Sequence, residues 1–310
     1  MMRATRGLTL HKEDLVVCAP FDYQRVASYH DGVRALLEYG EDAKILAGGQ
    51  SLGPMLALRL ARPSVLIDIN DAGEGQPSLD ADVLRMPALT RQRTAAESAL
   101  VAKHVPLLGH CVLHVGNVRV RNRGTIGGSL AHGDPTAEIA CAALALDAQV
   151  VAHGPNGERV IPVREFFLSY LTTALEPAEL VVEVRFPVMH ERQGWSFHEM
   201  TRRASDFAVV AVAAVVELDA DATTIRDCGV ALAGVADRPV LGPPEAVAGL
   251  VGSVGSPSEI ASAASALAGS TSPGSDIHAS GGYRRTLVEV LGKRALTEAV
   301  ERARRAVVGS

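Results

Sequence analysis

The sequence has only four cysteines among 310 residues, and no two of them are close enough to share a ligand loop. They are Cys18, Cys111, Cys141 and Cys228, so no Cys-x-x-Cys pair is present. Iron–sulfur clusters and structural zinc sites take closely spaced thiolates from one loop, and this spacing excludes both kinds of site. A disulfide framework is equally unexpected, and we predict reduced cysteines packed as small apolar residues.

The chain also lacks a surplus of positive charge. Its 30 Lys and Arg residues against 35 Asp and Glu give a net charge of −5. Proteins that bind nucleic acid normally carry a basic excess. The first twenty residues contain Arg3, Arg6, Lys12, Glu13 and Asp14, so no continuous apolar stretch marks a signal peptide there. We therefore expect a cytoplasmic protein that neither binds nucleic acid nor inserts into a membrane.

What is present is a chain long enough to bury more than one core. With 310 residues, 47% of them hydrophobic, two or three domains are expected. The first predicted element is a helix between Ser28 and Gly40 that places Val33, Leu36 and Leu37 on one face. A strand, a Gly-Gly turn, a helix and a second strand follow as a β-α-β unit, at residues 44–47, 48–49, 52–60 and 64–69.

The middle of the chain mixes helices and strands after a Gly- and Pro-containing segment at 71–77. A basic turn at 119–124 precedes a predicted helix at 135–146, for which Asp134 is available as N-cap. The other elements expected here are a strand at 83–86, helices between 92 and 113, a hairpin around 154–157 and a strand at 180–186.

The last third of the chain is rich in Val and Ala. Residues 207–216 and 225–235 predict two paired strands, which are followed by helical segments between 245 and 268. A terminal helix is predicted at 283–307. We place the domain boundary between residues 187 and 195.

Two Gly-Gly pairs adjoin apolar runs, and each is followed by a serine. Gly48-Gly49 precedes Ser51, and Gly127-Gly128 precedes Ser129. Paired glycines let successive N–H groups face an anion such as a diphosphate, and a helix start after Ser51 would add further N–H groups. For either pair taken alone, a tight turn without a ligand remains the alternative.

Neither pair fits the better-known phosphate motifs. The segment around Gly48 lacks both the Gly-x-Gly-x-x-Gly spacing and the Lys-Ser/Thr of a nucleotide triphosphate loop, which disfavours a Rossmann hydride-transfer fold. No Gly-x-Ser-x-Gly elbow is present and the ten histidines are scattered, which disfavours hydrolysis.

Several further segments belong with these pairs in order and spacing. They are Ala47-Gly48-Gly49-Gln50-Ser51-Leu52, Leu58-Arg59-Leu60-Ala61-Arg62-Pro63, Asp68-Ile69-Asn70, Arg121-Asn122-Arg123-Gly124-Thr125-Ile126-Gly127-Gly128-Ser129, Asp206-Phe207-Ala208 and Asp276-Ile277-His278-Ala279-Ser280. Together they resemble the FAD-binding medium subunit of the molybdenum hydroxylases, the family of carbon monoxide dehydrogenase and xanthine dehydrogenase. The resemblance covers about residues 17–305.

The resemblance implies an α+β fold and FAD as cofactor. Two subdomains of a PCMH-type FAD-binding fold, at about 15–70 and 71–190, would be followed by a small C-terminal domain of antiparallel sheet and helices at 195–310. Residues 1–14 would be an N-terminal extension. By the same resemblance the cofactor-binding residues are Ile45, Leu46, Ala47, Gly48, Gly49, Gln50, Ser51, Leu52, Thr125, Ile126, Gly127, Gly128, Ser129, Asp134, Glu138 and Val181.

The resemblance also implies a role for each group. Residues 45–52 would hold the diphosphate through backbone N–H groups, and 125–129 would form a second glycine loop against the diphosphate and the ribityl chain. Glu138, with Asp134 beside it, would accept a hydrogen bond from the cofactor, and Val181 would contact the flavin or the adenine. One departure concerns a lysine that contacts the flavin in distant relatives, where this chain has His198 followed by Glu199.

The implied function is that of an electron-transfer subunit. FAD would accept electrons from [2Fe-2S] clusters of a small partner subunit, after a molybdopterin-binding large subunit has oxidised the substrate, and would pass them to NAD, oxygen or a quinone. A dimer of heterotrimers is expected, with no catalytic side chain and no metal on this chain. The alternatives are a stand-alone FAD-dependent oxidase or dehydrogenase of an alcohol or hydroxy acid, and a cofactor-free assembly subunit.

Overall fold

The described part of the chain begins with a small parallel sheet. The computed structural model describes residues 18–73 and 75–308, so the predicted extension at 1–14 lies outside the described residues. Strands pair in the order β1–β3–β2, namely β1 (Asp22–Arg25), β3 (Val65–Asp68) and β2 (Ala43–Leu46). The crossovers are α1 (Tyr29–Tyr39) with the 3₁₀ turn η2 (Gly40–Asp42), and α2 (Leu52–Ala57). The predicted β-α-β unit is confirmed, and β1 is a further strand that sequence analysis missed.

Helix α1 shows how local sequence sets the ends of an element. The Ser28 hydroxyl oxygen accepts a hydrogen bond from the Asp31 N–H at 3.0 Å, and the helix ends at Gly40, whose φ is 57°. Val33 and Leu36 are buried, but Leu37 is 60% exposed. The prediction for Leu37 was wrong because neighbouring helical positions are about 100° apart, which turns Leu37 away from the sheet.

A larger antiparallel sheet follows. Its order is β4 (Ser78–Asp80), β5 (Val83–Pro87), β10 (Leu180–Pro187), β6 (Gln149–Gly154) and β7 (Gly157–Pro162). Strands β6 and β7 pair as a hairpin, and β10 runs through the middle of the sheet, so both predictions are confirmed. A short excursion after β7 contains α9 (Val163–Phe166), β8 (Phe167–Ser169) and β9 (Thr172–Thr173).

Helices between β5 and β6 cover this sheet. They are α3 (Gln92–Glu97), α4 (Ala99–His104), α5 (Pro106–His114), α6 (Val118–Arg123), α7 (Ile126–His132) and α8 (Glu138–Ala145). The predicted basic turn at 119–124 is wrong, because Asn117 caps α6 and accepts hydrogen bonds from the N–H groups of Arg119 and Val120. The predicted helix at 135–146 starts only at Glu138, because the Asp134 carboxylate bonds the Thr136 N–H at 2.7 Å and forms a turn.

The C-terminal part is an antiparallel sheet covered by two long helices. Its strands, in spatial order, are β11 (Gln193–Thr201), β12 (Ala208–Leu218), β13 (Ile225–Ala233) and β14 (Val240–Leu241). The helices that follow are α10 (Pro244–Val247), η3 (Ala248–Leu250), α11 (Pro257–Gly269) and α12 (Gly281–Val308). The predicted strand pair and the terminal helix are confirmed, whereas β11, which carries several polar residues, was missed.

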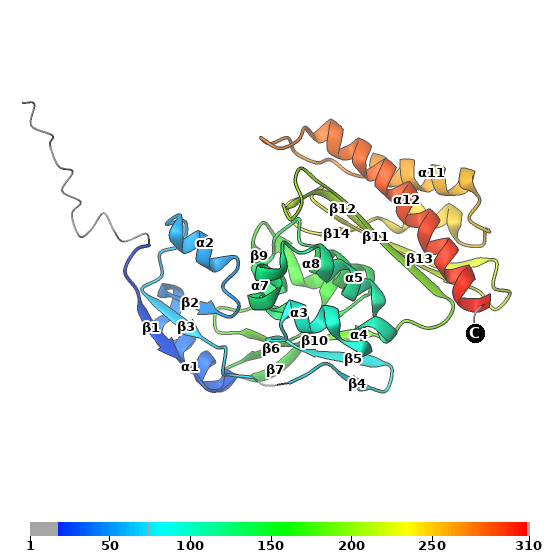
Figure 1. Cartoon of the computed structure of the whole chain (residues 1–310). Coiled ribbons are helices and arrows are strands. Elements are labelled where there is room, and N and C mark those ends of the chain that lie inside the picture. Colours follow the sequence, from blue (N-terminus) through cyan, green and yellow to red (C-terminus); the bar gives the residue numbers. More distant parts are fainter. Residues whose placement is uncertain (1–17, 74, 309–310) are drawn as a thin grey trace, which may run out of the picture.

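Both faces of this C-terminal sheet are buried. Figure 1 shows α11 and α12 over one face and α5 and α8 against the other. Ala211, Ala213 and Ala231 pack with the helices of the middle region, whereas Val212 and Leu232 pack under α11 and α12. Small alanine side chains let α8 come close, so that the Cys141 sulfur lies 3.5 Å from the Ala231 carbonyl oxygen. The sheet is therefore a wall shared by two cores.

The described residues show no disulfide, no membrane-spanning helix and no metal-ligand cluster. All four cysteines are free; Cys111, Cys141 and Cys228 are buried as predicted, and Cys18 is half-buried. In the described ranges no helix is both long and apolar enough to cross a membrane. Within the same residues, no three His, Cys, Asp or Glu side chains gather so that they could hold a metal ion.

Candidate functional site: a glycine turn held by a buried network

The turn between β2 and α2 presents a row of unpaired backbone N–H groups. The N–H groups of residues 48–52 donate to no acceptor among the described residues. Two carbonyl oxygens of the same turn do have partners. The Gly49 oxygen accepts a hydrogen bond from the Gly53 N–H at 2.9 Å, and the Gly48 oxygen accepts one from Gln50 Nε2 at 3.1 Å. Gly49 has a φ of 70°, which lets the chain turn here and aim successive N–H groups outward. A concave row of this kind binds anions.

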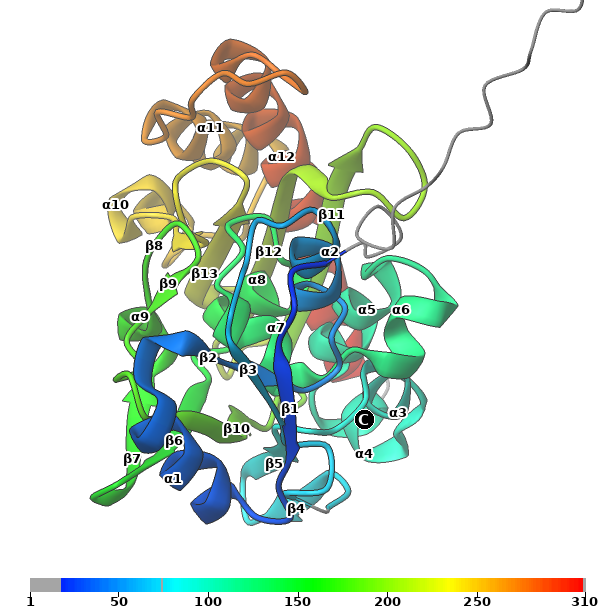
Figure 2. The same cartoon turned by 90° about the vertical axis from the view of Figure 1, so that its left-hand side faces the viewer.

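Gly48 brings this turn against the segment that joins α6 to α7. A Cβ atom at position 48 would lie 2.4 Å from the Arg123 carbonyl oxygen and 2.8 Å from the Gly124 Cα. No side chain fits into that space, so glycine is required by close approach. The two glycine-rich segments, more than 70 positions apart in the sequence, are therefore in contact, and a Cβ atom at Gly128 would likewise lie 3.8 Å from the Ala47 Cβ. Figure 2 shows α2 above α7.

A polar network holds the turn in place. Asn70 Nδ2 donates to the Ala47 carbonyl oxygen at 2.9 Å and to Asp68 Oδ1 at 2.6 Å. Arg91 donates to Asn70 Oδ1 at 2.7 Å and to the Arg123 carbonyl oxygen at 2.5 Å. Burial alone would raise the pKa of Asp68, but the hydrogen bonds from Tyr23 and Asn70 outweigh it and lower the pKa. An ionised Asp68 thus anchors Asn70, and Arg91 joins the two glycine segments.

The second glycine segment has a different structure from the predicted loop. Thr125 caps α7, and residues 126–129 form its first turn. All four N–H groups of this turn are already used: Ile126 donates to the Thr90 oxygen at 3.0 Å, Gly127 to the Ala88 oxygen at 2.8 Å, and Gly128 and Ser129 to Thr125. The prediction of a second loop with free N–H groups is therefore wrong, because the carbonyl oxygens after β5 and the Thr125 hydroxyl and carbonyl oxygens take those donors.

Two buried side-chain oxygens beside this segment have no partner. Thr90 Oγ1 and Gln92 Oε1 are buried and make no hydrogen bond with any described residue. They flank the joint at Gly124, where the Gln92 N–H donates to the Gly124 carbonyl oxygen at 2.9 Å. A polar ligand along this wall would satisfy them. Thr90, Gln92, Arg91, Asp68 and Asn70 were not among the predicted site residues, although the Asp-x-Asn at the end of a strand was a usable sign.

The remaining predicted site residues lie in α8, in the turn before it and in β10. Glu138 is buried at the start of α8, and burial raises its pKa to about 7. Asp134 lies in the turn before it, and Val181 is buried in β10, which α7 contacts. The structure thus places 45–52 and 125–129 in contact with each other and Asp134, Glu138 and Val181 behind them. Their binding of a cofactor stays a prediction.

His198 and Glu199 have partners inside the protein. His198 Nε2 lies 2.9 Å from Glu298 Oε2 on α12, and Glu199 Oε1 lies 3.1 Å from His114 Nδ1 on α5. The two side chains leave β11 on opposite sides of the strand, as the period of two requires. Because both side chains are engaged inside the protein, neither replaces the lysine that contacts the flavin in distant relatives.

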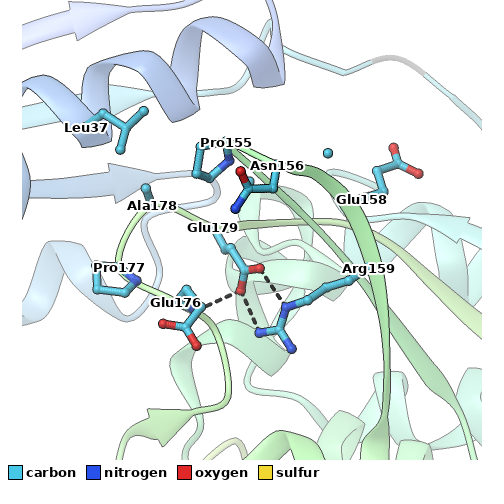
Figure 3. Close-up of a pocket in the computed structure, with 11 residues that line it drawn as sticks. Leu37, Pro155, Asn156, Glu158, Arg159, Glu176, Pro177, Ala178 and Glu179 are labelled. Carbon is cyan, nitrogen blue, oxygen red and sulfur yellow. Dashed lines mark hydrogen bonds and ion pairs between the residues drawn. The ribbon is translucent and has the colours of Figure 1, made fainter.

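A surface cavity elsewhere on the molecule does not coincide with this site. Figure 3 shows it between Leu37 of α1, the β6–β7 hairpin and the segment 176–179, with a volume of about 680 Å³. Arg159 is paired there with Glu179 by contacts of 2.6 and 2.8 Å, so its charge is already compensated. None of the predicted site residues lines this cavity, and we do not assign it to the cofactor.

The chain is similar to known proteins over nearly all of its length. Residues 19–189 match the family described as FAD binding domain in molybdopterin dehydrogenase, and residues 195–299 match the CO dehydrogenase flavoprotein C-terminal domain. Subunit alpha of the 6-hydroxypseudooxynicotine dehydrogenase complex of Paenarthrobacter nicotinovorans is 37% identical over 285 residues, which are 92% of this chain and 96% of that protein.

Carbon monoxide dehydrogenases give the same picture. The medium chain from Hydrogenophaga pseudoflava is 33% identical over 280 residues, 90% of this chain and 96% of that one. A solved structure of carbon monoxide dehydrogenase from this organism, which lacks the Mo-pyranopterin moiety, superposes with a TM-score of 0.89 at 33% identity. The superposed residues are 93% of this chain and 99% of the chain in that structure.

Proposed function

Because the chain belongs to the family of FAD-binding medium subunits of molybdenum hydroxylases, we propose that it is the electron-transfer subunit of such an enzyme. Electrons from iron–sulfur clusters of a small partner subunit reach FAD on this chain, and an external acceptor removes them. The chain is part of an oxidoreductase, and its own side chains position the cofactor. FAD, when bound, supplies the redox chemistry.

One observation carries the proposal. The N–H groups of residues 48–52 form an unpaired row in a turn that the Asp68–Asn70–Arg91 network holds rigid. A diphosphate matches such a row in charge and in its many acceptor oxygens, and short-range N–H contacts suffice even in a chain of net charge −5. Residues 45–52 therefore bind the diphosphate, and the unpartnered Thr90 and Gln92 oxygens face the cofactor at the adjoining wall.

The second glycine segment has a supporting role in this proposal. Residues 125–129 form a wall beside the turn, and Gly127 and Gly128 let that wall pack closely against Ala88 and the Thr125 hydroxyl. Asp134 and Glu138 lie where α7 gives way to α8 and take the flavin end, with Val181 in the strand below. Here the buried Glu138 carboxyl is the group that accepts a hydrogen bond from the cofactor.

The partners follow from the relatives. Their names describe a complex subunit and a medium chain, so each of those proteins works in a larger assembly. We infer a molybdopterin-binding large subunit and a [2Fe-2S] small subunit for this chain too, arranged as a dimer of heterotrimers.

A visible spectrum of the purified chain tests the cofactor. After reconstitution we expect a flavin spectrum at about one FAD per chain, and iron and molybdenum only when partner subunits are co-purified. A chain that stays colourless in excess FAD would overturn the proposal. Turnover of an alcohol or hydroxy acid by the chain alone, at ordinary enzyme rates, would favour a stand-alone oxidase instead.

A further inference from the structure

Ionisable side chains gather inside the junction between the middle region and the C-terminal sheet. Glu138 at the start of α8, Glu199 on β11 and His114 at the end of α5 come from three separate elements. Their exposure rises in that order: the whole of Glu138 is 9% exposed, the Glu199 side chain 11% and the His114 side chain 34%. Burial in this cluster therefore decreases from Glu138 to His114, the member that solvent can reach.

The middle member of this cluster is incompletely satisfied. Glu199 Oε1 lies 3.1 Å from His114 Nδ1, but Glu199 Oε2 is buried and has no partner among the described residues. A buried carboxylate oxygen without a donor is unfavourable, and a bound proton relieves it. Glu199 is thus poised to receive a proton from His114.

The electrostatic environment favours a bound proton at the two ends of this cluster, Glu138 and His114. Burial, assisted by the nearby charges of Glu199 and Asp134, raises the pKa of Glu138 to about 7. The hydrogen bond to Glu199 raises the pKa of His114, although burial and Arg121 act in the opposite direction. Both shifts favour the protonated form, one at the buried end of the cluster and one at its exposed end.

Two cysteines, Asp134 and His110 also lie around the cluster. Burial raises the pKa of the Cys141 thiol to about 12 and that of Cys111 well above its ordinary value, so both stay protonated. The Asp134 carboxylate is engaged by Thr136. The His110 ring lies 5.0 Å from the His114 ring, and burial with the charges of His114 and Arg302 lowers its pKa.

We propose that His114, Glu199 and Glu138 form a path that carries a proton from solvent to the FAD site when FAD is reduced. The proposal rests on the proposed function, because it needs FAD at the Glu138 end. Reduction of FAD by two electrons to its anionic reduced form takes up one proton. The electrons would come from the partner's clusters and the proton from Glu138; Glu199 would then reprotonate Glu138, His114 would reprotonate Glu199, and the bulk solvent would reprotonate His114.

Proton uptake by the FAD-loaded full chain tests the path. Flash reduction with a photochemical donor, followed with a pH-indicator dye, measures the rate of uptake. Glu199→Gln and His114→Gln should each slow it at least tenfold, whereas His278→Gln, a change at an exposed histidine, should leave it unchanged. Imidazole should restore the rate of His114→Ala, which a merely structural defect would not allow. Wild-type rates in the Glu199 and His114 variants would overturn the proposal.

A second test needs no flavin. Trp195 is the chain's single tryptophan, and its ring lies 5.3 Å from His110, so its fluorescence reports the charge of His110. Glu199→Gln removes the acceptor that holds the proton on His114, and the less charged His114 no longer lowers the His110 pKa as strongly. We expect the fluorescence midpoint to shift to higher pH in the variant. An unchanged midpoint would show that Glu199 does not hold the His114 proton and would overturn the path.

The two tests separate the two proposals. One outcome is that the wild-type chain fails to bind FAD while the Glu199→Gln variant still shifts the fluorescence midpoint. In that case the proposed function is wrong, but the interaction between Glu199 and His114 is confirmed. If FAD binds and proton uptake is indifferent to Glu199 and His114, the electron-transfer proposal stands and the path is wrong.

Discussion

The two Gly-Gly pairs look alike in sequence and differ in structure. Around Gly48-Gly49 the N–H groups of residues 48–52 are unpaired, whereas around Gly127-Gly128 the N–H groups of residues 126–129 are all bonded within the protein. The first segment is a turn before a short helix, and the second is the first turn of a capped helix. The first can bind an anion through its backbone, and the second supports it.

The difference arises from what surrounds each pair. The second segment lies against the chain that follows β5, where the carbonyl oxygens of Ala88 and Thr90 accept its first N–H groups. The first segment follows β2 at the edge of the parallel sheet, where no strand offers acceptors to its N–H groups. An anion site thus depends on the absence of protein acceptors as much as on the glycines themselves.

The largest effect is expected from a charge in the first segment. Gly49→Asp places a carboxylate at the unpaired N–H row, and because opposed like charges cost several kcal/mol we expect FAD affinity to fall by about 100-fold or more. Equilibrium titration with FAD measures this. Gly252→Asp is the matched control, since Gly252 also has a positive φ and open space around it. Equal losses in both variants would contradict the assignment.

A methyl group in the second segment should affect stability instead. In Gly127→Ala the new Cβ would lie 2.5 Å from the Ala88 Cβ, and overpacking of this kind costs about 1–3 kcal/mol. Urea denaturation measures the loss, and the folded fraction should keep its FAD affinity. Gly292→Ala in α12, where the new Cβ would lie 3.8 Å from the Ala264 Cβ of α11, should be neutral or stabilising. A Gly127→Ala protein of full stability but lost FAD affinity would reverse the two roles.

The link between the segments should have an intermediate effect. Arg91→Met removes the hydrogen bonds to Asn70 and to the Arg123 carbonyl oxygen. Since bonds of this type contribute about 1.5 kcal/mol, we expect FAD binding to weaken about tenfold. Calorimetric titration checks this, with Arg93→Met, which breaks only an exposed pair with Glu97, as control. Unchanged affinity in Arg91→Met would mean that the network does not hold the turn.

The smallest effect concerns the cap of the second segment. Thr125→Val keeps the shape but removes the oxygen that accepts the Gly128 N–H, and loss of an N-cap costs about 1 kcal/mol. Thermal unfolding should show this loss, while Thr125→Ser, which keeps the oxygen, should retain the cap. If Thr125→Val instead strengthens FAD binding strongly, the freed Gly128 N–H can act as a ligand donor.

The sequence predicted the elements well where a local cap or period decides them. The helix after Ser28, the hairpin around 154–157 and the paired strands in the last third were predicted from such features. Prediction from the sequence failed where the structure depends on hydrogen-bond acceptors or packing partners that are distant in the chain. No local feature of the sequence shows that Ala88 and Thr90 accept the N–H groups after Thr125. Strand β11 was missed because its burial comes from packing on α5 and α12.

The predicted site was incomplete for the same reason. The glycine segments could be found because their residues are consecutive, whereas Arg91, Thr90 and Gln92 act only after folding brings them to Arg123 and Gly124. Family resemblance identified the cofactor, and only the structure separated the segment that presents N–H groups from the one that does not.

Hydrogen exchange at backbone amides tests the central claim most directly. In the chain without FAD, the amides of residues 48–52 should exchange rapidly and those of residues 126–129 slowly, because only the latter are bonded. Adding FAD should slow exchange at residues 48–52 and leave residues 126–129 nearly unchanged. Protection that appears at residues 126–129 but not at 48–52 would contradict the account.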